Sequence, residues 1–203
     1  MKQETIERII AENKAWVKHN FDFEAPELGL VEEVGEFCHQ LLKAGQKIRV
    51  TSNDLRKDAA VDMAIFFFHL CWRYNYRPPA SYHPLARTVK WHIGILAMFA
   101  GKIIATIEDH GSDIPFFLEG FWVNLCDVFH AEGWDMEESI VTIWDEVKKR
   151  DFRAYPGTGL PPEKEAGAPN HLFASGARVP SLCQHCGQVE GDSVHTMFSS
   201  PKI

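Results

Sequence analysis

The sequence predicts an all-α protein, and two observations carry that prediction. Most apolar residues recur at spacings of three and four, and almost no segment shows the alternation that is typical of a β-strand. Residues that start and stop helices stand between these apolar stretches. The expected helices span residues 2–19, 27–45, 53–74, 83–109, 115–132 and 136–152.

The ends of the second and third helices carry clear signals. Pro26 precedes the second helix, and Gly45 stands where its C-terminal cap is expected. Ser52 or Asn53 can cap the third helix, and a pair of prolines follows its end. The first three helices are therefore expected to be separate elements.

Similar signals bound the later helices. Gly111 and Pro115 separate the fourth helix from the fifth. Gly133 ends the fifth helix, and Asp135 can cap the sixth, whose first turn is acidic.

The composition changes after Tyr155, where the run PGTGLPP cannot continue a helix. We therefore expect a main domain over residues 1–155, a linker over 156–170 and a small module over 171–203. Within the main domain, residues 78–114 are interpreted as a helical insertion.

Composition limits the classes of function. The chain is 45% hydrophobic with six Trp and 14 Phe, which suits a sizeable core. A net charge of −7 argues against a general nucleic-acid or anionic-membrane surface. The most apolar stretch, residues 63–72, is too short to cross a bilayer. We expect a cytoplasmic protein, because an odd number of cysteines, five, without a signal segment does not indicate a disulfide framework. Cys38, Cys71 and Cys126 lie in apolar helical segments and are interpreted as buried.

The candidate site is built from two acidic segments within apolar helices. Glu32, Glu33 and Glu36 share an arc of the second helix, and Asp58 and Asp62 share a face of the third. Burying such carboxylates is costly unless a charge compensates them, and converging carboxylate oxygens suit Mg²⁺ or Mn²⁺. The alternative is a solvated acidic face for Glu32 and Glu33, and a capping or paired core aspartate for Asp62.

A stripe of the second helix adjoins its glutamates and is expected to be buried, with Gly35 allowing a neighbouring helix to approach closely. It consists of Leu28, Val31, Gly35, Cys38 and Leu42.

The segment LVEEVGE at residues 30–36, followed by an aspartate in an apolar helix, resembles the MazG family. That family belongs to the all-α nucleoside triphosphate pyrophosphohydrolases, with the dimeric dUTPases as relatives. Its pattern is E-x-x-E on one helix and E-x-x-D on the next, matched here by Glu33, Glu36 and Asp62. Ala59 replaces the usual first acid of the second pair, and Asp58 can substitute for it.

Other segments carry the same resemblance. Residues 16–21, 132–138 and 147–156 are similar to the end of the family's first helix, its turn into the last helix and its closing segment. The similarity covers residues 5–75 and 115–156.

The resemblance implies hydrolysis of a (deoxy)nucleoside triphosphate to the monophosphate and pyrophosphate, which would shape or cleanse the nucleotide pool. Glu33, Glu36, Asp58 and Asp62 would bind Mg²⁺ or Mn²⁺, which lowers the pKa of a bound water. Either Glu32 or Glu33 would position that water as a base. A homodimer or homotetramer is implied, because family members build the pocket between subunits.

Cationic and aromatic residues are candidates for substrate binding, beside structural alternatives. Lys148, Lys149, Arg150 and Arg153 can hold phosphates or simply complement the end of the last helix. The remaining candidates are Trp16 for base stacking or for the core, Asn20 for a base edge or a helix cap, and Tyr155 in the closing segment.

The C-terminal module contains a C-x2-C pair, Cys183 and Cys186, with His171 and His195 on either side. These four residues can form a closed structural Zn²⁺ site, and metal binding can supply the folding energy of so polar a segment. Two free thiols are the alternative, and few basic residues surround the pair, which makes nucleic-acid binding unlikely. The attached zinc knuckle is also reminiscent of phage-encoded family members.

Two other functions stay open. The chain can be a non-catalytic helical adaptor whose zinc module binds a protein or nucleic-acid partner, an interpretation that Ala59 favours. It can also hydrolyse another pyrophosphate-linked or nucleoside diphosphate substrate.

Overall fold

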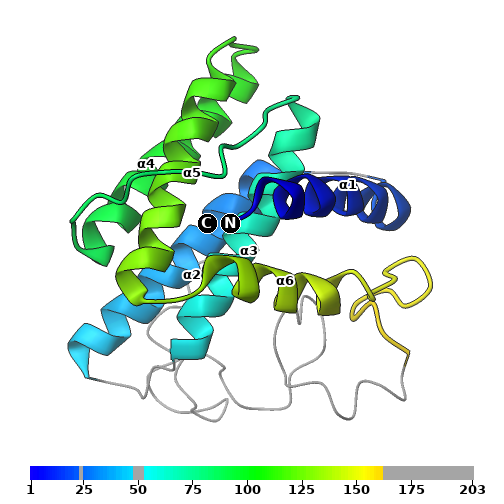
Figure 1. Ribbon diagram of the computed structural model, residues 1–203. Coiled ribbons are helices and arrows are strands. Elements are labelled where there is room, and N and C mark those ends of the chain that lie inside the picture. Colours follow the sequence, from blue (N-terminus) through cyan, green and yellow to red (C-terminus); the bar gives the residue numbers. More distant parts are fainter. Residues whose placement is uncertain (23–24, 48–52, 162–203) are drawn as a thin grey trace, which may run out of the picture. The chain divides into compact units, whose positions relative to one another are not determined.

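The computed structural model describes residues 1–22, 25–47 and 53–161, and within these ranges the chain forms helices and no strand (Figure 1). The prediction of an all-α protein is confirmed for this part of the chain. The helices are α1 (Gln3–Asn20), α2 (Pro26–Gln46), α3 (Asn53–Arg73), α4 (Val89–Glu108), α5 (Ile114–Glu132) and α6 (Met136–Val147).

Several predicted helix ends are confirmed by their caps. Pro26 is the first residue of α2, and Gly133 closes α5 with a positive φ of 72°. The Asp135 carboxylate accepts a hydrogen bond of 2.9 Å from the Glu138 backbone N–H at the start of α6. These local signals act through backbone groups that lack partners at a helix end, which is why the sequence alone shows them.

Three predicted helix ends are wrong. The fourth helix begins at Val89 instead of residue 83, because the Thr88 hydroxyl caps it by accepting a bond from the Trp91 N–H. The sixth ends at Val147 instead of residue 152, and turns follow it. Gly45 does not cap α2; the helix continues to Gln46, and Lys47 takes the left-handed conformation with φ of 55°.

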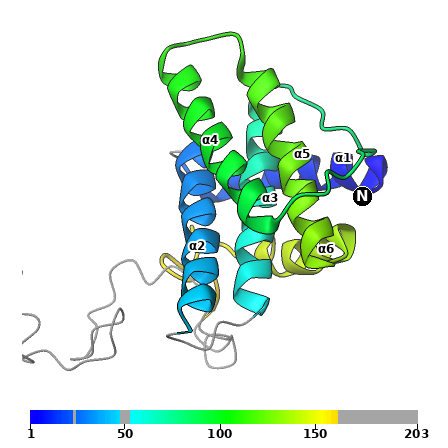
Figure 2. The same ribbon diagram turned by 90° about the vertical axis from the view of Figure 1, so that its left-hand side faces the viewer.

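The core is organised around α3, which contacts α1, α2, α5 and α6. Figure 2 shows α3 between α2 and α5. Because α3 has neighbours on several sides, its second half is buried nearly all round, and Phe67, Phe68 and Leu70 have no exposed surface. Such a helix lacks a polar face.

Close helix packing depends on two glycines. A Cβ atom on Gly29 of α2 would overlap the ring of Phe66 on α3. A Cβ atom on Gly120 of α5 would overlap the ring of Phe99 on α4. Figure 1 and Figure 2 show α2 and α3 running antiparallel, so their acidic segments can face each other, as the sequence predicts.

One described helix, α4, is long and apolar enough by length and composition to cross a membrane, although only these criteria support it. Only 28% of its most apolar 18-residue window is buried. Residues 63–72, the most apolar stretch of the sequence, are too short to cross a bilayer, whereas α4 has 20 residues.

Candidate functional site

The acidic segments of α2 and α3 form one electrostatically coupled cluster. Glu33 is almost wholly buried, and neither of its carboxylate oxygens has a hydrogen-bond partner within the described residues. Burial, followed by the negative charges of Asp62, Glu36, Glu32 and Asp58 in that order, raises the pKa of Glu33 to about 9. The carboxyl groups of the two helices therefore lie within electrostatic reach of one another.

The pKa values of Asp62 and Glu36 are raised as well. The pKa of Asp62 is raised to about 7, mainly by burial and then by the charge of Asp58, while Arg150 lowers it in part. The pKa of Glu36 is raised by burial and then by the charges of Glu32 and Asp58. A group of carboxyl groups that hold protons this firmly needs a compensating positive charge in order to ionise.

The position of Asp58 bears on the departure from the family pattern. Ala59 is buried in the core. Asp58 is half-buried and its charge acts on Glu33, Glu36 and Asp62. That Asp58 replaces the missing acid of the second pair stays a prediction.

The carboxyl groups of the cluster have the chemistry that binds a divalent cation, but they do not converge on one point in this structure. Among the described residues, no three His, Cys, Asp or Glu side chains are arranged as a group that could hold a metal ion. The buried and unpartnered carboxylate of Glu33 is the observation that fits a cation, because oxygen ligands of this kind suit Mg²⁺ and Mn²⁺. Glu36, Asp58 and Asp62 are the further candidate ligands.

The closing segment after α6 reaches the cluster through Arg150. Its positive charge lowers the pKa of Asp62, which places the guanidinium within electrostatic reach of that carboxylate. In the sequence Arg150 is one of four neighbouring cations, and only the tertiary structure distinguishes it.

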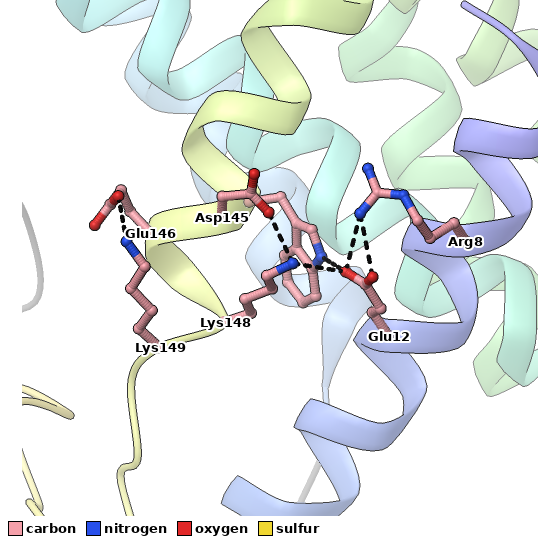
Figure 3. Close-up of polar contacts among 7 residues, drawn as sticks. Arg8, Glu12, Asp145, Glu146, Lys148 and Lys149 are labelled. Carbon is pink, nitrogen blue, oxygen red and sulfur yellow. Dashed lines mark hydrogen bonds and ion pairs between the residues drawn. The ribbon is translucent and has the colours of Figure 1, made fainter.

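The other cations of that group are paired with carboxylates. Lys148 forms ion pairs with Glu12 at 3.2 Å and with Asp145 at 2.7 Å, and Lys149 pairs with Glu146 at 2.6 Å (Figure 3). Figure 3 also shows Arg8 reaching the same Glu12 carboxylate from α1, at 3.1 Å.

Arg153 pairs with the exposed Asp22. The exposed pairs each stabilise the fold by no more than about 1 kcal/mol, so phosphate can compete for these side chains.

Trp16 and Asn20, the predicted base contacts, bind the closing segment in this structure. The Trp16 indole N–H donates to the Arg150 carbonyl at 2.9 Å. The Asn20 side chain accepts from the Phe152 N–H at 2.6 Å and donates to the Arg150 carbonyl at 3.5 Å. Both residues therefore position Arg150, and their contact with a nucleotide base stays a prediction.

The Trp16 ring lies in an aromatic group. It makes edge-on contacts with Phe21, Trp144 and Phe152, with ring centroids 5.5 to 6.1 Å apart. Tyr155, the last predicted substrate contact, is exposed a few residues further along.

The expected burial of the α2 stripe is wrong. Leu28, Val31 and Leu42 are 59%, 40% and 54% exposed, and Gly35 and Cys38 are also exposed. The helix buries Leu30, Val34 and Phe37 instead, so the apolar positions of α2 divide between two faces. Cys38 is consequently not a core residue, whereas Cys71 and Cys126 are buried as predicted.

Two internal polar pairs could not be predicted from the sequence. Arg56 of α3 pairs with Glu132 at the end of α5 at 3.1 Å, and both side chains are largely buried. His92 of α4 lies 3.6 Å from Asp127 of α5, with both side chains fully buried. Residues this distant in sequence give no pairing signal before the helices are placed.

The predicted Zn²⁺ ligands lie outside the described residues. They are His171, Cys183, Cys186 and His195, and the zinc site stays a prediction.

Comparison with known proteins identifies no family. No family model, no curated protein and no solved structure matches this chain.

Proposed function

We propose that this protein is a metal-dependent nucleoside triphosphate pyrophosphohydrolase that cleaves a (d)NTP to the monophosphate and pyrophosphate. The observation that supports it best is the coupled carboxyl cluster of α2 and α3 with Arg150 beside it. Carboxyl groups that need a cation, next to a guanidinium that suits phosphate oxygens, are the two parts that a triphosphate requires.

The chain's own residues have distinct tasks in this reaction. Glu33, Glu36, Asp58 and Asp62 would hold Mg²⁺ or Mn²⁺, which neutralises phosphate charge and makes a bound water more acidic. Glu32 is exposed beside them and can accept a proton from the attacking water, a task for which Glu33 is the alternative. Arg150 would bind the phosphate chain.

The reaction balances without any further reactant. A water oxygen attacks the α-phosphorus, the bond from that phosphorus to the α–β bridging oxygen breaks, and the bridging oxygen leaves with pyrophosphate. The proton lost by the water passes to the carboxylate base. The positions of Trp16 and Asn20 next to the Arg150 carbonyl would hold the cation-bearing segment against the cluster.

The test is a panel of NTPs and dNTPs incubated with Mg²⁺ or Mn²⁺, with the products separated by ion-exchange chromatography. Monophosphate and pyrophosphate are expected from one or a few substrates. Glu36→Gln and Asp62→Asn should abolish turnover, whereas Glu7→Gln, an exposed acid of α1, should leave it unchanged. Diphosphate and orthophosphate, or no product with either metal, would refute the proposal.

A homodimer or homotetramer and a structural zinc module belong to the same proposal. Sedimentation equilibrium and metal analysis of the full chain test them separately.

A further inference from the structure

The outward face of α4 carries a stripe of apolar residues, and the exposed Lys102 lies beside it. Trp91, Gly94, Met98, Gly101 and Ala105 are all exposed and follow one another at spacings of three and four. We call these five residues the α4 seam. Trp91 is 43% and Met98 48% exposed, and a Cβ atom added at Gly94 or Gly101 would meet no other atom within 4 Å.

The seam has the spacing of a helix that packs against another helix. Residues at alternating intervals of three and four recur with the period at which two helices keep contact along their length. The opposite side of α4 already packs inside the molecule through His92, Ile93 and Leu96. A single helix that is apolar on both sides is therefore left with one side unpaired.

The charges beside the seam indicate which partner fits. The N-terminal end carries Arg87 and Lys90, and the C-terminal end carries Glu108 and Asp109, all of them exposed. The Arg87 guanidinium lies 5.8 Å from the Trp91 ring centroid, which places positive charge over the first seam residue. A partner helix that runs antiparallel with the same charge order would match basic ends with acidic ends.

We propose that a second copy of this chain docks on the α4 seam, with the two α4 helices antiparallel about a two-fold axis near Met98. Only a surface that is complementary to itself can form such an interface, and this one is. Large Trp91 then faces small Ala105, Gly94 faces Gly101, and Met98 faces its own copy.

The same arrangement pairs the flanking charges. On a helix, Lys90 and Glu108 lie on the same flank of the seam, since 18 residues complete five turns. A two-fold axis brings matching flanks together, so Lys90 of each copy meets Glu108 of the other. The interface lies on the insertion and does not depend on the proposed hydrolase activity.

The test is sedimentation equilibrium of the full chain over a range of micromolar concentrations, with circular dichroism to confirm folding. The wild type should be a dimer. Lys90→Glu or Glu108→Lys alone places like charges opposite each other twice, and should raise the dimer Kd about tenfold or more. The double variant Lys90→Glu/Glu108→Lys should restore the wild-type Kd to within about threefold.

Two more variants distinguish the faces. Met98→Asp should raise the Kd by about 100-fold or more, because two charges would be buried on the axis. Leu42→Lys, on the exposed stripe of α2, should leave an α4-mediated dimer intact.

Several outcomes would overturn the proposal. They are a monomeric wild type, a dimer that Met98→Asp and the single charge reversals leave unchanged, a double variant that fails to recover, and a dimer that Leu42→Lys alone dissociates. Co-sedimentation of a monomeric wild type with phosphatidylcholine vesicles, lost in Met98→Asp, would assign the face to a membrane and equally overturn it.

Discussion

The buried Glu33 carboxyl group makes stability depend on pH in a direction opposite to that of a salt-bridged acid. Its pKa is about 9 in the folded protein, against 4.5 as its ordinary value. Between these two values the folded state binds a proton that the unfolded state has released, so the free energy of unfolding falls as pH rises. The stabilisation is complete below pH 4.5 and is lost as pH rises toward 9.

The magnitude follows from the shift. Each pH unit in that interval lowers the free energy of unfolding by about 1.4 kcal/mol, which gives about 3 kcal/mol at pH 7 relative to pH 4.5. Glu33→Gln keeps the shape and removes the ionisation, so it should be more stable than the wild type at pH 8 and nearly equal to it at pH 5. A divalent cation should restore the wild type at pH 8, because it binds the ionised folded state.

The assay is urea unfolding followed by tryptophan fluorescence at several pH values from 5 to 9, with and without Mg²⁺. The control is Glu32→Gln on the exposed side of α2, whose difference from the wild type should stay below about 1 kcal/mol at every pH. Parallel curves for Glu33→Gln and the wild type would refute the reasoning, because they would show that Glu33 ionises normally in the folded protein.

Three further predictions concern the closing segment and the packing of α2. Arg150→Gln should raise the pKa of Asp62 further, because Arg150 lowers it in the wild type, and should weaken triphosphate binding about tenfold; NMR titration and a binding isotherm measure both, and an unchanged pKa contradicts it. Asn20→Ala should lower the free energy of unfolding in urea by about 1–3 kcal/mol, because the hydrogen bonds between its side-chain amide and the closing segment are lost. A change near zero would show that these hydrogen bonds contribute nothing to stability. Gly29→Ala should lower the free energy of unfolding by about 1–3 kcal/mol, because the added Cβ would overlap the ring of Phe66. Gly35→Ala should not lower it, because a Cβ added there meets no other atom within 4 Å.

The helix ends show how much of the fold the sequence determines locally. Pro26, Gly133 and Asp135 act on backbone groups one to four residues away, so their effects are predictable without tertiary structure. The end of α6 was misplaced because the segment after Val147 is helix-compatible in sequence but is bonded to α1 through Trp16 and Asn20.

The sequence by itself determined the all-α class, most helix ranges and the acidic residues of the candidate site, because helical periodicity and capping are properties of neighbouring residues. Only the tertiary structure decided that Glu33 is buried, that the charge of Arg150 acts on Asp62 and that the α2 stripe and the α4 seam face outward. The physical reason is that an apolar stripe shows which side of a helix can be covered, whereas the neighbour that covers it is chosen by contacts between residues far apart in the chain.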